Sequence, residues 1–129
     1  MRRDVNSITE RIIGAALTVH RELGPGLLES AYKACLSFEF VERGLIFERE
    51  MPLPIVYRGH RLDCGYRLDF LVEDEVIVEV KSVEHVERVH FSQLLSYLRQ
   101  YRRRVGLLFN FNVRWLVRDG LKRIVNGYE

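Results

Sequence analysis

The sequence of 129 residues lacks the features that would set it apart from ordinary globular proteins. It has two cysteines, three prolines, one tryptophan and a net charge of only +2. Cys35 and Cys64 lack C-x-x-C spacing, which predicts buried thiols in a reducing compartment, although a disulfide between them stays open. No apolar run is long enough to span a membrane, and residues 1–4 lead into no signal-peptide core. We therefore expect one cytoplasmic domain, residues 1–129, with its own core.

The strongest β-strand pattern lies at residues 76–83, a β-branched run typical of a strand covered on both faces. Such strands rarely carry charge, because burying an unpaired charge destabilises the fold. Glu79 and Lys81 nevertheless lie within it, and the period-two alternation of a strand places both side chains on one side. The two residues form either a functional site at the end of a core strand or a same-face ion pair.

A second carboxylate comes from the predicted strand at residues 67–72, where Asp69 lies opposite the apolar face. If the two strands pair as a hairpin, Asp69 lies beside Glu79. Two carboxylates and the backbone carbonyl of Val80 form an all-oxygen pocket, which suits Mg²⁺ or Mn²⁺ and not zinc. Lys81 can then orient an attacking water and offset negative charge. The alternative is that Asp69 is a simple strand-end residue. The apolar face of this strand consists of Leu68, Phe70 and Val72.

Three motifs resemble those of a known family, and their order along the chain is also the order in that family. Asp69 followed by Glu79-Val80-Lys81 resembles the D…(D/E)-x-K signature of the PD-(D/E)XK nuclease superfamily, with arginine and leucine at 67–68 in place of its proline. The segment GLLESAY at 26–32 is similar to the defining motif of the GxxExxY family within that superfamily. The segment QLLSY at 93–97 resembles the Q-x-x-x-Y element of its exonuclease-like branch. The resemblance covers residues 8–125.

The resemblance implies an α/β, restriction-endonuclease-like αβββαβ core with a mixed central sheet flanked by helices and one extra N-terminal helix. It also implies a Mg²⁺- or Mn²⁺-dependent nuclease that hydrolyses phosphodiester bonds, more often of DNA than of RNA. Asp69, Glu79 and Lys81 would be its catalytic core, with the Val80 carbonyl as a further metal ligand. The alternative is a non-catalytic nucleic-acid-binding or protein-interaction module that retains the fold.

The same resemblance assigns roles to three residues outside the core. Glu29 would reach the metal directly or through water, with Tyr32 one helical turn away. Otherwise Glu29 is a favourable anion in the first turn of a helix. Gln93 would contact the scissile phosphate or a metal-bound water, and Tyr97 would lie beside the site. Otherwise both belong to a partly buried polar flank.

Charge is unevenly distributed along the chain. Residues 1–85 hold 11 Lys and Arg against 15 Asp and Glu, whereas residues 86–129 hold 9 against 3. A basic C-terminal third beside an acidic pocket would hold a polyanion over a metal site, with Arg99, Arg102, Arg103 and Arg104 contacting nucleic acid. The alternative is a set of solvated surface arginines. A homodimer is compatible with this function, and no membrane partner is expected.

The other elements follow from periodicity and turn residues. A capping box at Ser7 and Glu10 should begin the first helix, with His20 structural or exposed near its end. Pro52 and Pro54 should place the strand at 47–57 at a sheet edge or a bulge, because neither can donate a ladder hydrogen bond. The remaining expected helices are at 27–43, with Ala31, Cys35 and Phe38 buried, and at 86–101. The remaining expected strands are at 61–72, after a hairpin turn at 58–60, and at 105–110 and 121–125. The segment at 111–118 is either a loop or a short helix.

Overall fold

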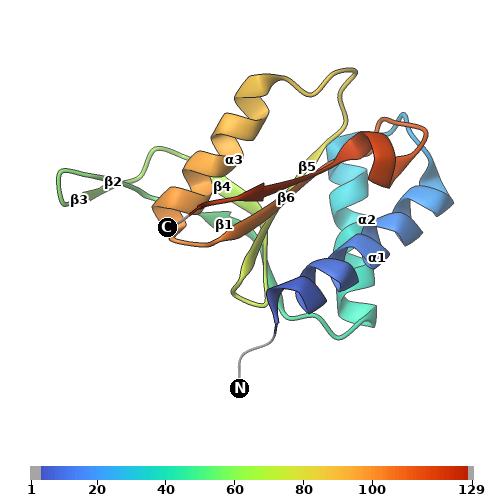
Figure 1. Ribbon diagram of the computed structural model, residues 1–129, viewed down its shortest axis with the longest axis horizontal. Helices are drawn as coiled ribbons and strands as arrows, with labels where there is room; N and C mark the ends of the chain where they lie inside the picture. Colours follow the sequence, from blue (N-terminus) through green and yellow to red (C-terminus); the bar gives the residue numbers. More distant parts are fainter. Residues whose placement is uncertain (1–3, 128–129) are drawn as a thin grey trace.

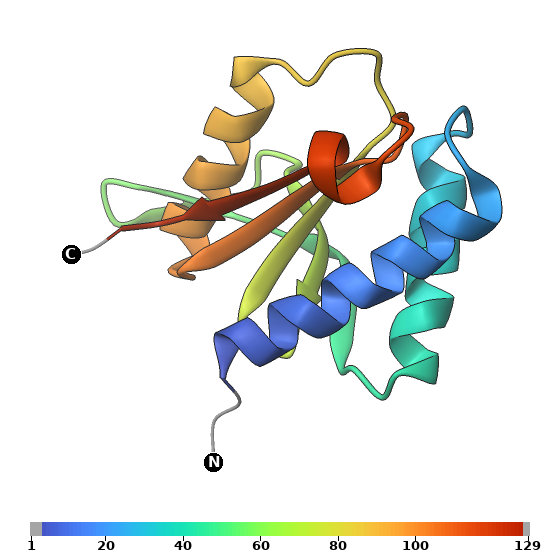
Figure 2. The same cartoon turned by 45° about the vertical axis from the view of Figure 1, so that its right-hand side comes forward.

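The computed structural model describes residues 4–127 and contains a mixed five-stranded sheet between two layers of helices (Figure 1). Helices α1 (Val5–Leu23) and α2 (Glu29–Glu42) cover one face of the sheet, and α3 (Arg88–Tyr101) covers the other (Figure 2). The predicted α/β class, with a mixed central sheet flanked by helices and two helices ahead of the first strand, is confirmed.

The sheet has the order β1-β4-β5-β6-β7. Neighbouring strands are antiparallel except β5 and β6, which α3 connects as a parallel pair. Burial of the β5 residues 76–80 confirms a strand covered on both faces. The strands of this sheet are β1 (Phe47–Pro52), β4 (Arg67–Val72), β5 (Val76–Lys81), β6 (Val105–Asn110) and β7 (Leu121–Val125).

The segment between β1 and β4 differs from the prediction. It forms a two-stranded arm, β2 (Ile55–Tyr57) and β3 (His60–Leu62), which projects beyond the main sheet (Figure 1). The expected continuous strand at 61–72 is wrong, because a loop with Gly65 at φ +79° separates β3 from β4. The strand expected at 47–57 is also divided, because β1 ends at Pro52 and β2 begins at Ile55 in a separate sheet. β1 does lie at the edge of the main sheet, as predicted.

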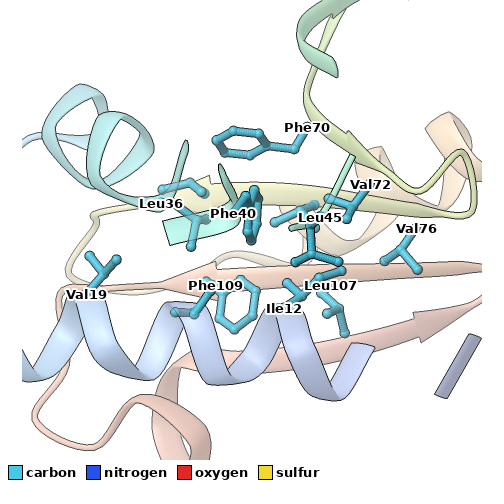
Figure 3. Packing of buried hydrophobic residues seen from close by; sticks show 14 of the residues in the cluster. Ile12, Val19, Leu36, Phe40, Leu45, Phe70, Val72, Val76, Leu107 and Phe109 are labelled. Atoms are coloured by element: carbon cyan, nitrogen blue, oxygen red, sulfur yellow. The ribbon is translucent and has the colours of Figure 1, made fainter. Parts of the chain in front are cut away.

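Two hydrophobic clusters fill the spaces on either side of the sheet. Figure 3 shows the larger one, where Ile12 and Phe40 from the helix pair meet Phe70 and Phe109 from the strands. The smaller cluster lies under α3 and includes Leu68 and Leu71. The expectation that Leu68 shares a face with Phe70 is therefore wrong, and the alternation of β4 is interrupted beside Asp69.

The two N-terminal helices also depart from the sequence pattern. α1 begins after Asp4 without a side-chain cap, so the predicted capping box at Ser7 and Glu10 is wrong. α2 buries Tyr32, Leu36 and Phe40, at i, i+4 and i+8. The predicted stripe of Ala31, Cys35 and Phe38 is rotated from this face, and Phe38 is 63% exposed.

Three smaller expectations have clear outcomes. His20 is structural, because it is buried and its Nε2 lies 2.7 Å from the carbonyl oxygen of Val113. Both cysteines are free, and Cys64 is exposed instead of buried. The segment at 111–118, expected as a loop or a short helix, leads into a single π-helical turn at Leu116–Gly120.

No helix within residues 4–127 has the length and apolar character needed to cross a membrane.

Candidate active site

The candidate site lies where strands β4 and β5 separate. Their regular pairing ends at Phe70 and Val78, one residue before Asp69 and Glu79. From there side chains bridge the strands: the backbone N–H of Asp69 donates to Oε2 of Glu79 at 2.9 Å, and the N–H of Val80 donates to Oδ2 of Asp69 at 2.8 Å. The two carboxylates therefore lie side by side in the gap, as the predicted hairpin required.

Burial makes both carboxylates costly to ionise. Glu79 is only 6% exposed. Its burial, and then the negative charge of Asp69, raise its pKa to about 8, although the positive charge of Lys81 acts in the opposite direction. Burial likewise raises the pKa of Asp69, against the Val80 N–H bond and the charge of Lys33. A cation bound between these two acids would favour their ionised forms and so offset the repulsion between their charges.

Lys33 is a site residue that the sequence pattern did not reveal. Its Nζ lies 3.2 Å from Oδ1 of Asp69 and 2.8 Å from Oε2 of Glu50. Burial lowers the pKa of Lys33, but the bonds and charges of Glu50 and Asp69 outweigh it and raise that pKa. Lys33 follows Glu29 by four residues on α2, so both project from one face of the helix. This spacing was the one signal in the sequence that could have identified it.

Glu50 reaches the site through an irregularity in the edge strand. β1 pairs Arg49 with Phe70 and Met51 with Leu68, so Glu50 is left without a regular partner opposite Asp69. Its φ of +54° lies in the left-handed region, which is unfavourable for a residue with a side chain. Such a distortion turns a side chain out of the normal alternation. Here it brings the carboxylate of Glu50 to Lys33.

Lys81 is the last residue of β5 and is half-buried. It pairs with Asn110 of β6, and its carbonyl accepts the N–H of Phe111 at 2.9 Å. Lys81 follows Glu79 by two residues in β5, so strand alternation places both side chains on one face, where the positive charge of Lys81 lowers the pKa of Glu79. The expected association of Glu79 with Lys81 at one end of β5 is therefore present.

Glu29 lies at the neighbouring end of the sheet. As the first residue of α2, it accepts the N–H of Ser82 at 3.2 Å through Oε2. Ser82 also donates its hydroxyl to the carbonyl of Leu27 at 2.5 Å. The start of α2 is thus attached to the residue that directly follows Lys81.

Tyr32 fixes the turn that precedes Glu29. Its hydroxyl donates to the carbonyl of Gly24 at 2.6 Å and accepts the N–H of Leu27 at 3.1 Å. The ring is fully buried and stacks on Phe111, with 4.5 Å between ring centroids. Tyr32 therefore determines the position of the α1–α2 turn from within the core.

α3 contributes Gln93 and Tyr97 on the other face of the sheet. Burial raises the pKa of Tyr97 to about 12, and the charges of Glu79, Tyr66 and Asp69 act in the same direction. A hydrogen bond with the Gln93 side chain opposes this rise. Tyr97 therefore stays protonated at neutral pH, and its side chain belongs to the same buried cluster as Leu68, the neighbour of Asp69. His90, earlier on the helix, accepts the N–H of Glu87 in a cap.

The arginines assigned to nucleic acid do not lie beside the carboxylates. Arg102, Arg103 and Arg104 precede β6, whose first residue pairs with Val76 at the opposite end of β5 from Lys81. Val76 and Lys81 are five residue steps apart along β5, a distance of about 16 Å. The arginines line a hollow of about 480 Å³ that also contains acidic side chains. Arg99 is exposed in the last turn of α3.

Arg103 has a structural role. Its guanidinium forms an ion pair with Asp74 at 2.7 Å and lies over the ring of Tyr101. This leaves Arg102 and Arg104 as the exposed members of the run. The arginines at 102–104 therefore do not form the basic surface that was expected directly over the acidic pocket.

The donor atoms fit a hard cation only in part. Asp69 and Glu79 share a corner of carboxylate oxygens whose joint ionisation a divalent ion would favour. Within residues 4–127, however, no group of three Asp, Glu, His or Cys side chains is arranged to hold a metal ion. Glu29 instead bonds to the backbone of Ser82. The side chains thus fit a site built on two carboxylates, with further ligands from backbone or water.

The family model of the PD-(D/E)XK nuclease superfamily matches residues 6–124, which cover the helices and strands apart from the first residue of α1 and the last residue of β7. The chain belongs to the PD-(D/E)XK nuclease superfamily. The mixed sheet between helices is consistent with the restriction-endonuclease-like fold of these proteins. No curated protein and no solved structure matches the chain. Superfamily membership supports a nuclease-type function acting on nucleic acid.

Proposed function

We propose that this superfamily member is a divalent-metal-dependent nuclease that hydrolyses phosphodiester bonds, with DNA preferred over RNA. The observation that carries the proposal is the pair of reciprocal hydrogen bonds between Asp69 and the Glu79-Val80 segment, with Lys81 at the same strand end. The motif at residues 26–32 further suggests the GxxExxY group, since Glu29 and Tyr32 position the α1–α2 turn against the end of β5.

Asp69, Glu79 and the carbonyl of Val80 would hold Mg²⁺ or Mn²⁺, with Glu29 assisting through water. When bound, this ion supplies Lewis-acid stabilisation of the charge that develops on the phosphoryl oxygens. The protein's own contribution begins with Lys33, which neutralises one oxygen of Asp69 and limits its rotation. Glu79 is held by the backbone N–H of Asp69, so both acids are oriented before substrate binds.

Lys81 positions the attacking water and offsets negative charge in the transition state. An ammonium has three donors and no acceptor, so it can hold a water oxygen and a phosphoryl oxygen together. Gln93 donates an amide N–H to a phosphate oxygen. Tyr97 acts as a hydrogen-bond donor and not as a base, because its pKa of about 12 keeps the phenol protonated at neutral pH.

The test compares cleavage of labelled single-stranded, duplex and branched DNA and of RNA, with Mn²⁺ or with EDTA. The critical variant is Lys81→Ala, and Lys122→Ala is its control because Lys122 is an exposed lysine on β7. We expect Mn²⁺-dependent cleavage by the wild type and the control. Lys81→Ala should be slower by roughly 10²–10⁴-fold, the usual effect of losing a positioned catalytic group. Equal cleavage by both variants would reject the role of Lys81.

A second candidate is a nucleic-acid-binding module without catalysis. It is favoured by the ion pair in which Lys33 already neutralises Asp69, and by the lack, within residues 4–127, of three Asp, Glu, His or Cys side chains arranged to hold a metal ion. Salt-dependent binding with no cleavage of any substrate would support this candidate and reject the nuclease.

A further inference from the structure

A groove of about 360 Å³ lies beside the candidate site, between α3 and the chain segments that lead into and out of the β2–β3 arm. This volume is within the range of pockets that hold small organic groups. The residues that line it include no aspartate, glutamate, lysine, arginine or histidine. Its polar surface consists of the side chains of Ser92, Ser96, Gln93 and Gln100, and its aromatic surface comes from Tyr66 and Tyr97.

The two tyrosines give the groove an open aromatic surface. Their ring centroids are 5.8 Å apart at an interplanar angle of 64°, a T-shaped contact. Tyr97 is buried, whereas Tyr66 is 42% exposed. The contact with Tyr97 therefore holds the Tyr66 ring in place and leaves part of it accessible for stacking.

The groove shares two residues of α3 with the candidate active site. Gln93 and Tyr97 line it, and Tyr97 packs in the same buried cluster as Leu68, which directly precedes Asp69 in β4. A molecule in the groove would therefore lie next to a phosphodiester held at the carboxylates. The uncharged lining offers an anionic phosphate no counter-charge, but it suits a planar group with polar edges.

We propose that this groove binds an unpaired nucleobase of the substrate, stacked on Tyr66 with its polar edge on the amide and hydroxyl groups of α3. This inference rests on the proposed nuclease function and specifies its substrate class as single-stranded or frayed nucleic acid. A base within a duplex is stacked and paired, so it cannot enter the groove without being extruded. Aromatic stacking of this kind tolerates any base sequence.

The test measures binding of the full chain to a fluorescent single-stranded oligodeoxynucleotide and to its blunt duplex, by anisotropy in EDTA to prevent cleavage. Tyr66→Ala removes the stacking surface, and Ser96→Trp fills the groove while leaving both tyrosines in place. Tyr57→Ala is the control, because Tyr57 is an exposed tyrosine of the β2–β3 arm that does not line the groove. Circular dichroism of each variant verifies that the fold is intact.

We expect tighter binding of the single strand than of the duplex. Tyr66→Ala should weaken single-strand binding by about fivefold to a hundredfold, the range for losing one stacked base. Ser96→Trp should weaken it as well, whereas Tyr66→Phe and Tyr57→Ala should stay within about twofold of the wild type.

Equal affinity for single strand and duplex, unchanged by Tyr66→Ala and Ser96→Trp, would overturn the groove assignment. Metal-dependent cleavage in the substrate panel would then still support the nuclease, so the two proposals fail separately. Absence of binding to either nucleic acid would also overturn the groove assignment, and the panel alone would then decide the nuclease.

Discussion

The ammonium of Lys33 lies 3.2 Å from Oδ1 of Asp69, although the two residues are 36 positions apart in the chain. The same ammonium contacts Glu50 at 2.8 Å, so one cation from α2 bridges acids on two neighbouring strands. Lys33 is 17% exposed and Asp69 15% exposed, which weakens solvent screening of the pair. The helix layer is thereby attached electrostatically to the candidate active site.

Replacing Lys33 with methionine keeps the length of the side chain and removes its charge. We expect Lys33→Met to lower the free energy of unfolding by about 1–3 kcal/mol, because Asp69 and Glu50 lose a charged hydrogen-bond donor. Urea denaturation of the metal-free protein measures this change. In the double-mutant cycle with Glu50→Gln, we expect an interaction energy of at least 0.5 kcal/mol, roughly, as for residues in contact.

Arg21→Met is a suitable control, since Arg21 is an exposed cation in the last turn of α1. It should change the unfolding free energy by less than about 0.5 kcal/mol. Equal destabilisation by the two substitutions, or strict additivity of Lys33→Met with Glu50→Gln, would show that the bridge contributes nothing specific.

Glu79 makes the stability of the metal-free protein depend on pH. Its pKa is raised to about 8 in the folded state, against an ordinary value of 4.5 in the unfolded chain. Between these values the folded protein keeps a proton that the unfolded chain has lost, so unfolding becomes easier as pH rises. We expect the unfolding free energy to fall from about pH 5 to about pH 8, by up to about 1.4 kcal/mol per pH unit, and then to level off.

Urea titrations at pH 5, 6.5, 8 and 9 measure this slope. Glu79→Gln should flatten it, because the amide cannot titrate yet can still accept the N–H of Asp69. Glu48→Gln, at an exposed position of β1, should leave it unchanged. A slope that persists in Glu79→Gln would assign the pH dependence to other groups.

The strand pair at the centre of the site was predictable from local pattern. A β-branched run interrupted by Glu79 and Lys81 indicated a covered strand with a charged end, and the preceding strand at 67–72 was expected to pair with it as a hairpin. Together these placed Asp69 beside Glu79, which the hydrogen bonds between them confirm. Local pairing suffices here because the ladder between β4 and β5 is regular up to Phe70 and Val78, the chain neighbours of Asp69 and Glu79.

Contacts between distant elements were not predictable in this way. Glu50 reaches Lys33 only because its backbone adopts a left-handed conformation that no glycine signals. The buried face of α2 was misassigned because its apolar residues surround much of the helix, so periodicity did not select Tyr32 and Leu36.

The position of the arginines was not predictable for a different reason. A count of charges along the chain does not show at which end of the sheet the charged residues lie. Parallel pairing of β5 and β6 puts the residues that precede β6, among them Arg102 and Arg104, beside the start of β5 and away from Lys81. This consequence follows from the topology and not from composition.

Tyr32 links core packing to the candidate site. We expect Tyr32→Phe to lower the free energy of unfolding by about 1–3 kcal/mol, because the Gly24 carbonyl and the Leu27 N–H lose a buried partner. The same change should reduce cleavage, since the turn also positions Glu29. Chemical denaturation and the cleavage assay measure the two effects.

Tyr57→Phe is the matched control, because the Tyr57 side chain is 61% exposed. It should leave stability and cleavage unchanged. A Tyr32→Phe variant as stable as the wild type would contradict the role given to its hydroxyl.

Gly120 is required by close contact with the end of β6. A Cβ at this position would collide with the backbone carbonyl of Asn110 and lie 2.9 Å from Val113. We expect Gly120→Ala to destabilise the protein by about 2 kcal/mol or more through this overpacking. Differential scanning calorimetry should show a lower Tm.

The control for this substitution is Gly127→Ala, since a Cβ at Gly127 would meet nothing within 4 Å. Its Tm should equal that of the wild type. The effect at Gly120 should extend to the site edge, because the Asn110 side chain bonds to Val83 just beyond β5. An unchanged Tm for Gly120→Ala would contradict the tight packing of this turn.

The most direct measurement is the single-turnover rate of Mn²⁺-dependent cleavage by Asp69→Asn, compared with Asp63→Asn, whose aspartate lies exposed in the loop before β4. Asp69→Asn keeps an acceptor for the Val80 N–H but removes the charge that Glu79 and Lys33 face. We expect cleavage to fall by roughly 10³-fold or more in Asp69→Asn, in line with the loss of a charged group that acts on the transition state, and to stay at the wild-type rate in Asp63→Asn. Cleavage by Asp69→Asn at the wild-type rate would contradict the assignment of the β4–β5 gap as the active site.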